Sequence, residues 1–136
     1  MILGIGTDLV DSRRIAKSLD RFGARFETRI FTDNEIETAR NKPNPAIFYA
    51  KRFAIKESVY KALSGADMAG LGWREAETLN ESNGAPKLLL YGACKTALER
   101  LTPEGYKASV HLSLSDELPY AQAFVIISAT SIQTGI

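Results

Sequence analysis

The chain has little of the residues that build disulfide frameworks and zinc sites. It contains one cysteine, Cys94, and one histidine, His111. A lone cysteine excludes a disulfide within the chain, and together with a lone histidine it argues against a zinc site of the Cys/His type. Cys94 stands in a helical pattern close to alanines, so we expect its thiol to be buried and inert.

Long apolar runs and an excess of one charge are also missing. No apolar stretch approaches the length that spans a membrane, and Met1 runs into strand-like residues without the basic segment of a signal peptide. The net charge of +1 gives no global reason to bind nucleic acid or a membrane surface. With 45% hydrophobic and 24% charged residues, the composition is globular. We therefore expect one soluble, cytoplasmic domain spanning residues 1–136.

The most informative stretch is residues 48–63, which contains neither glycine nor proline and is long enough to predict a helix. Apolar side chains cover two of its sides, which indicates that the helix is buried. Between those sides, a sector about 60° wide holds Ala50, Ala54, Glu57 and Lys61. A Glu–Lys pair one turn apart is either an ordinary ion pair worth a few tenths of a kcal/mol or part of a site.

Residues 2–10 predict a strand that carries Gly4, Gly6 and Asp8 on one face. Glycine inside a strand often marks the close approach of another backbone or of a ligand. A carboxylate beyond two such glycines fits a metal or phosphate–metal site. Equally, Asp8 could help to start the next helix, for which Asp11 and Ser12 are suitable N-caps.

The segment that follows is basic. Residues 12–30 carry a net charge of +4, whereas the whole chain carries +1. On a solvated helix such a run is common, but its concentration on a nearly neutral chain favours a docking surface for an acidic partner. Nucleic acid is the other candidate, and no nucleic-acid motif supports it. The ribbon comprises Arg14, Lys17 and Arg21, continued by Arg25 and Arg29 if the backbone stays helical past Gly23.

Local signals predict the remaining elements. A capping box at residues 32–35 opens a short helix, and a glycine-rich loop over residues 64–72 has amides that could receive phosphate oxygens. The tail after Ala129 is expected to fray. The order of elements predicts an α+β fold with a largely antiparallel sheet. Its helices are expected at residues 32–40 and 91–101, and its strands at 74–79, 87–90, 106–115 and 120–128.

Three stretches together are specific to one family: GIGTDLVDSRRI, FYAKRFAIKESVYKAL and HLSLSDELPYA. In their order, their spacing and its total length, the chain resembles the holo-[acyl-carrier-protein] synthases, the small 4′-phosphopantetheinyl transferases of fatty acid synthesis. The resemblance implies the fold of that family, with the antiparallel sheet wrapped around one long central helix. It also implies homotrimers with active sites between subunits.

The resemblance implies an activity. Enzymes of this family move the phosphopantetheine group of coenzyme A to a serine of apo acyl carrier protein and release adenosine 3′,5′-bisphosphate. A divalent ion, normally Mg²⁺, bridges the pyrophosphate and two carboxylates, which match Asp8 and Glu57. Lys61 matches the family lysine on the phosphates, and the alanines beside it would leave room for the ligand.

Other residues acquire expected roles from the same resemblance. Arg52 resembles the residue that holds the 3′-phosphate of coenzyme A, and Gly65 lies in the loop expected to contact the cofactor. His111 matches a site histidine that acts as a base, a substrate contact or a structural hydrogen-bonding group. The acidic recognition helix of the carrier would meet Arg14, Lys17, Arg21 and Arg25.

The loop after the central helix reads SGADMAG where the family commonly has a Gly-Thr-Gly element. Two other functions stay open. One is a catalytically silent module that binds carrier proteins, against which the intact carboxylate pair argues. The other is a metal-dependent hydrolase of the coenzyme A pyrophosphate, which would not need the basic ribbon.

Overall fold

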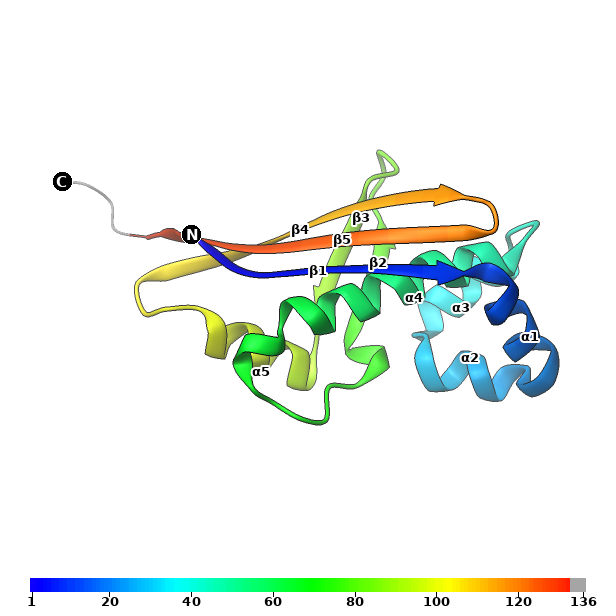
Figure 1. The fold of residues 1–136 in the computed structure, drawn as a ribbon, viewed down its shortest axis with the longest axis horizontal. Helices are drawn as coiled ribbons and strands as arrows, with labels where there is room; N and C mark the ends of the chain where they lie inside the picture. Colours follow the sequence, from blue (N-terminus) through cyan, green and yellow to red (C-terminus); the bar gives the residue numbers. More distant parts are fainter. Residues whose placement is uncertain (133–136) are drawn as a thin grey trace.

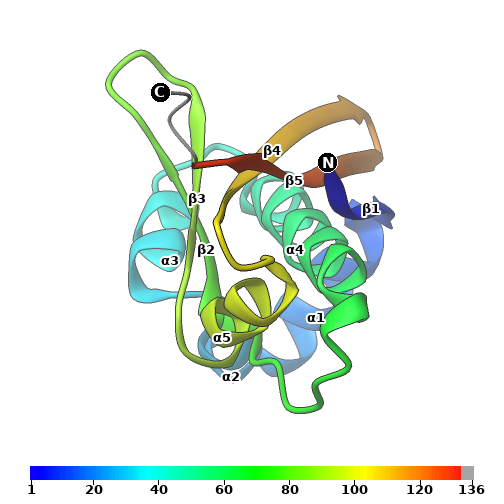
Figure 2. The same ribbon diagram turned by 90° about the vertical axis from the view of Figure 1, so that its left-hand side faces the viewer.

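A three-stranded antiparallel sheet lies over one long helix in the computed structural model, which describes residues 1–132 (Figure 1). A separate two-stranded ribbon stands beside the helix (Figure 2). Within the described residues, no helix is long and apolar enough to cross a membrane. The sheet has the order β1 (Ile2–Asp11), β5 (Tyr120–Ser131), β4 (Tyr106–Glu117), and the ribbon pairs β2 (Ala76–Asn80) with β3 (Pro86–Leu90).

The helices gather at the two ends of the long helix α4. Helices α1 to α3 lie near its beginning and α5 near its end (Figure 1). The Asp11 side chain caps α1 by accepting a hydrogen bond from the Arg13 amide at 2.9 Å, and Thr32 and Glu35 form the expected capping box of α3. The helices are α1 (Ser12–Phe22), α2 (Ala24–Ile30), α3 (Asp33–Arg40), α4 (Pro45–Ala62) and α5 (Gly92–Leu101).

Helix α4 contributes to both hydrophobic cores of the described chain. In its C-terminal half, Ile55 and Val59 belong to the core formed with β5 and α5. In its N-terminal half, Phe48 and Tyr49 belong to the core formed with α1, α2 and α3. The helix begins at Pro45 rather than at residue 48, because proline fits the first turn of a helix. Its apolar sides are therefore buried, as the sequence predicted.

Strand β1 approaches α4 so closely that two of its positions need glycine. A Cβ added at Gly4 would lie 1.9 Å from the carbonyl oxygen of Ala62, and one added at Gly6 would lie 1.9 Å from that of Ser58. Of the two readings of these glycines, the close approach of another backbone is therefore confirmed. Asp8 follows on the same face of the strand and so faces α4.

Some boundaries differ from the expected ones. Gly23 has a φ of +53°, which ends α1, so Arg25 and Arg29 lie on a separate helix and do not continue the basic ribbon. Strands β4 and β5 pair from Tyr106 with Ser131 to Glu117 with Tyr120. This pairing makes the prediction of fraying after Ala129 wrong for residues 130 and 131, and residues 133–136 lie outside the described residues. Residues 73–75 form a 3₁₀ turn before β2 instead of beginning the strand.

Replacing Gly6 with alanine should destabilise the protein, because the added methyl group would overlap the backbone of α4. We expect the free energy of unfolding, measured by urea denaturation, to fall by about 2–3 kcal/mol. Thr130→Ala, at an exposed position of β5, is the control and should change it by less than about 0.5 kcal/mol. A Gly6→Ala protein as stable as the parent would contradict the close contact between β1 and α4.

Candidate active site

Asp8, Glu57 and Lys61 meet where β1 crosses α4. Asp8 and Glu57 line one pocket of about 320 Å³. The Lys61 Nζ atom lies 3.2 Å from Asp8 Oδ1 and donates a hydrogen bond to the carbonyl oxygen of Thr7 at 2.8 Å. Within residues 1–132 the acidic partner of Lys61 is thus Asp8 and not Glu57. The reading of an ordinary Glu57–Lys61 pair is therefore wrong.

The two carboxylates influence each other electrostatically. Burial raises the pKa of Glu57, and the negative charge of Asp8 raises it further, while the charge of Lys61 lowers it. A pair of acids whose charges disfavour each other gains from a cation placed between them. Carboxylate oxygens suit Mg²⁺, which commonly uses one or two of them together with substrate phosphates and water. The donor set therefore fits the implied ion, and within residues 1–132 no third acidic, histidine or cysteine ligand completes the set.

The surroundings decide two open points. Asp11 and not Asp8 caps α1, so the role of Asp8 in starting that helix is excluded. Ala50 and Ala54 on α4 are completely buried. Ala50 belongs to the same core as Ala121 of β5, and Ala54 belongs to the same core as Ala123 of β5. They allow α4 to lie close to β5 and leave no room for a ligand, so that expectation was wrong.

His111 lies on the face of the sheet that points away from α4. Its neighbours Val110 and Leu112 pack into the core, so the predicted alternation of β4 is confirmed. The His111 Nε2 atom makes a 2.9 Å hydrogen bond with Ser128 Oγ on β5. Because Asp8 faces α4 on the other side of the sheet, a single chain does not bring His111 to the carboxylates.

Arg52 is a buried cation without an acidic partner in the described chain. Its side chain is 5% exposed, its guanidinium lies 4.6 Å from the centre of the Phe48 ring, and its Nη2 atom donates to Asn80 Oδ1 at 3.2 Å. Within residues 1–132 its buried Nε atom has no hydrogen-bond partner. Burial lowers the pKa of Arg52. It lines a pocket of about 490 Å³ that shares no residue with the pocket of Asp8 and Glu57.

Gly65 lies in a 3₁₀ turn, η1 (Ser64–Ala66), directly after α4. A hydrogen bond joins this turn to α5: Arg100 Nη1 donates to the Ala66 carbonyl oxygen at 3.2 Å. A Cβ added at Gly65 would lie 3.2 Å from a methyl group of Leu101. The glycine is exposed and follows Lys61 by four residues.

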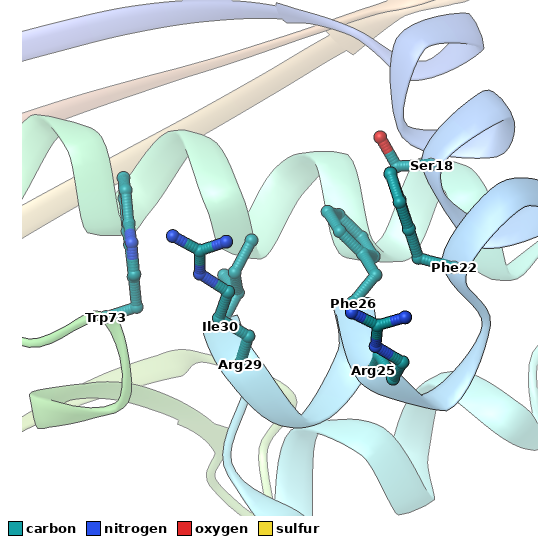
Figure 3. A pocket seen from close by; sticks show the side chains of 7 residues that line it. All are labelled: Ser18, Phe22, Arg25, Phe26, Arg29, Ile30 and Trp73. Atoms are coloured by element: carbon teal, nitrogen blue, oxygen red, sulfur yellow. The ribbon is translucent and has the colours of Figure 1, made fainter.

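Another pocket, of about 380 Å³, adjoins the pocket of Asp8 and Glu57 and shares Ser18 and Phe26 with it. Arg25 and Arg29 extend from α2 into this pocket, between Trp73 at one end and Phe22 at the other (Figure 3). Arg25 therefore lines this mostly apolar pocket and does not lie on the α1 face that carries Arg14, Lys17 and Arg21. The pocket is lined by Ser18, Phe22, Arg25, Phe26, Arg29, Ile30 and Trp73.

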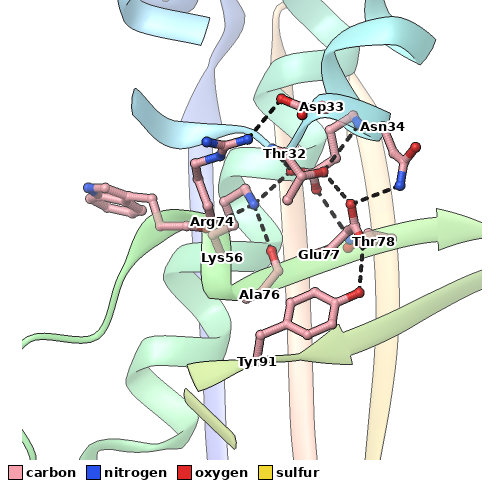
Figure 4. A network of polar contacts seen from close by, with 11 residues as sticks. Thr32, Asp33, Asn34, Lys56, Arg74, Ala76, Glu77, Thr78 and Tyr91 are labelled. Atoms are coloured by element: carbon pink, nitrogen blue, oxygen red, sulfur yellow. Dashed lines mark hydrogen bonds and ion pairs between the residues drawn. The ribbon is translucent and has the colours of Figure 1, made fainter. Parts of the chain in front are cut away.

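Sequence reasoning missed the role of Lys56, the residue before Glu57. The Lys56 side chain is completely buried, and its Nζ atom pairs with Glu35 Oε1 at 2.8 Å. It also donates to the carbonyl oxygens of Trp73 at 2.9 Å and Ala76 at 2.6 Å (Figure 4). These contacts tie α4 to α3 and β2 and hold the turn of α4 that carries Glu57. The clue in the sequence was a lysine on a helix that is apolar on two sides.

Known proteins resemble this chain in sequence and in fold. The sequence model of the 4′-phosphopantetheinyl transferase superfamily matches residues 4–123. The chain belongs to this superfamily. It is 48% identical over 132 residues to a holo-[acyl-carrier-protein] synthase of Methylorubrum populi, with 97% of each chain covered.

Solved transferase structures agree with the fold. The holo-[acyl-carrier-protein] synthase of Neisseria meningitidis superposes with a TM-score of 0.80 at 35% identity, covering 94% of this chain and 99% of the other. A coenzyme A complex of the Chronobacterium ammoniagenes enzyme superposes with a TM-score of 0.77 at 27% identity, covering 93% and 97%. The expected family, the α+β fold class and the enzyme class, a phosphopantetheinyl transferase, are confirmed.

Replacing Lys56 with methionine should destabilise the fold strongly, because it leaves the Glu35 carboxylate buried without its counter-ion. We expect a loss of about 3–5 kcal/mol in the free energy of unfolding, measured by urea denaturation. Lys51→Met, on the same helix but with a partly exposed side chain, is the control and should lose less than about 1 kcal/mol. Equal losses in the two variants would show that the Lys56 network does not hold α4.

Proposed function

We propose that this chain transfers the 4′-phosphopantetheine group of coenzyme A to a serine of an apo acyl carrier protein and releases adenosine 3′,5′-bisphosphate. The observation that carries the proposal is the meeting of Asp8, Glu57 and Lys61 in a member of the transferase superfamily. Two carboxylates that would bind Mg²⁺ and an ammonium group that would bind phosphate are the groups that pyrophosphate chemistry needs.

The transfer exchanges one phosphorus–oxygen bond for another. The serine oxygen forms a bond to the phosphorus that carries pantetheine, and the bond from this phosphorus to the bridging oxygen breaks. The serine proton goes to Asp8 or to a water molecule beside it, and the bridging oxygen leaves with the adenosine bisphosphate. When bound by Asp8 and Glu57, Mg²⁺ would neutralise charge on the phosphoryl oxygens. Lys61 would stabilise the negative charge that develops on the leaving oxygen.

Arg52 is proposed to bind the 3′-phosphate of coenzyme A. A buried guanidinium without a counter-ion carries a cost that a bound anion would offset. Its Nε atom supports this role, since no acceptor for that N–H lies among the described residues. Asn80, whose side chain already orients the guanidinium, lines the same pocket.

The complete site is proposed to form between copies of the chain in a homotrimer. Arg52 and His111 lie apart from the carboxylates of their own chain, so a neighbouring copy would have to bring these groups together. The outer face of the sheet, which carries His111, also exposes apolar side chains that a neighbour could cover. Ile5 is 58% exposed, Leu9 63% and Phe124 38%.

The carrier is proposed to dock on α1 and α2. Arg14, Lys17 and Arg21 are exposed on α1 and would attract an acidic helix. The adjoining pocket with Arg25 and Arg29 is mostly apolar, so it suits an apolar side chain on such a helix. Because this pocket shares Ser18 and Phe26 with that of Asp8 and Glu57, a carrier held there would lie next to the proposed catalytic residues.

Glu57→Gln should fold normally and lose transfer, because the variant keeps the shape of the side chain but removes a metal-binding charge. The measurement is intact-mass spectrometry of apo acyl carrier protein after incubation with the enzyme, coenzyme A and Mg²⁺. The parent should add one phosphopantetheine group per carrier and should stop doing so in EDTA. For Glu57→Gln we expect a rate at least about 100-fold lower.

Glu99→Gln, on the exposed face of α5, is the matched control for Glu57→Gln and should keep the parent rate. An active Glu57→Gln enzyme would refute the proposal that Glu57 binds the metal ion. If the parent modified no carrier while a known synthase did so under the same conditions, the silent binding module would replace the transferase.

Reversing the charge of Lys17 and Arg21 to glutamate should raise the KM for the carrier by at least about tenfold, since the docking attraction becomes repulsion. Arg14 is left unchanged because it lines the pocket of Asp8 and Glu57. The control reverses Lys87 and Lys95, two exposed cations on β3 and α5. An unchanged KM would refute docking on α1, and coenzyme A hydrolysis without any carrier would favour the hydrolase.

A further inference from the structure

We propose, on the basis of the metal site proposed above, that Lys61 is the counter-ion of Asp8 in the free enzyme and leaves it when substrate binds. The ammonium group then moves from the carboxylate to the pyrophosphate of coenzyme A. Metal and coenzyme A consequently bind interdependently: each is held weakly alone and more tightly in the presence of the other.

The position of the ammonium group is the first support. Lys61 Nζ lies 3.2 Å from Asp8 Oδ1 and 2.8 Å from the Thr7 carbonyl oxygen, so it sits directly against the carboxylate. Mg²⁺ binds carboxylate oxygens at about 2 Å. A divalent ion on Asp8 would therefore lie within a few ångströms of a like charge, and the two cations repel each other strongly at that distance.

The freedom of Lys61 to leave is the second support. Its side chain is 53% exposed and it contributes one ammonium group on a flexible stem. An exposed ion pair of this kind is weak, so a more highly charged acceptor can replace the carboxylate. Lys56, five residues earlier on α4, shows the opposite arrangement, since it is completely buried and held by three acceptors.

The consequence is a coupling between the two ligands. In the free enzyme, Lys61 opposes metal binding because it occupies Asp8 and adds a positive charge. The pyrophosphate supplies oxygen ligands to the metal and at the same time offers Lys61 a new partner. By thermodynamic reciprocity, the factor by which coenzyme A tightens metal binding equals the factor by which the metal tightens coenzyme A binding.

The experiment is a titration of the full chain with Mn²⁺, followed by the electron paramagnetic resonance signal of the free ion, without carrier protein. Lys61→Met should bind Mn²⁺ on the order of tenfold more tightly than the parent in the absence of coenzyme A. Lys61→Arg, which keeps the charge, should bind as weakly as the parent. Lys51→Met is the matched control on the same helix, because Lys51 pairs with the distant Asp116, and it should also match the parent.

Adding coenzyme A should tighten Mn²⁺ binding to the parent by at least about tenfold and to Lys61→Met by clearly less, because the methionine variant has no ammonium group to release. Glu57→Gln should lose the binding, which assigns the signal to this site. Equal Mn²⁺ affinity of the parent and Lys61→Met would overturn the role of Lys61 while leaving the metal site intact. Absence of Mn²⁺ binding to both, with or without coenzyme A, would overturn the metal site and the role of Lys61 together.

Discussion

The contact between the backbones of β1 and α4 is the constraint on which the site depends. Gly4 and Gly6 leave no side chain between strand and helix, so the strand packs directly against the carbonyl groups of Ala62 and Ser58. Asp8 continues the same face of the strand and therefore reaches the helix where Glu57 and Lys61 project. A larger residue at either glycine would separate the elements and, with them, the two carboxylates. The same contact thus contributes to stability and sets the geometry of the candidate site.

Whether a buried charged group is paired within the chain distinguishes residues that stabilise the fold from candidate ligand-binding residues. Lys56 is buried against a carboxylate and two carbonyl oxygens, and Glu27 is buried against Arg40 and Tyr49. Both groups are satisfied within the chain, so they stabilise the fold without a ligand. Arg52 is also buried, but within residues 1–132 it forms no ion pair and its Nε atom has no hydrogen-bond partner. A charge that the fold leaves without a partner is the stronger indication of binding.

Much of the fold and part of the site could be predicted from local patterns. The alternation of β4, the capping box of α3 and the glycines of β1 are signals carried by neighbouring residues, so their predictions were confirmed. The break at Gly23 was not predictable with certainty, because glycine is tolerated inside helices as well as at their ends. The burial of Lys56 depends on residues of α3 and β2 that are distant in sequence. Helical spacing alone could not distinguish it from the exposed Lys61.

The separation of the proposed site residues within one chain constrains how the enzyme can work. Asp8, Glu57 and Lys61 share one side of the sheet, whereas His111 lies on the other and Arg52 lines a pocket of its own. Coenzyme A is long enough to touch distant groups, but it cannot pass through the sheet. If His111 and the carboxylates contact the same cofactor, they must therefore come from different copies. In the proposed homotrimer, assembly and substrate binding would then be coupled, because different copies would bring the carboxylates, the histidine and the buried arginine to one molecule of coenzyme A.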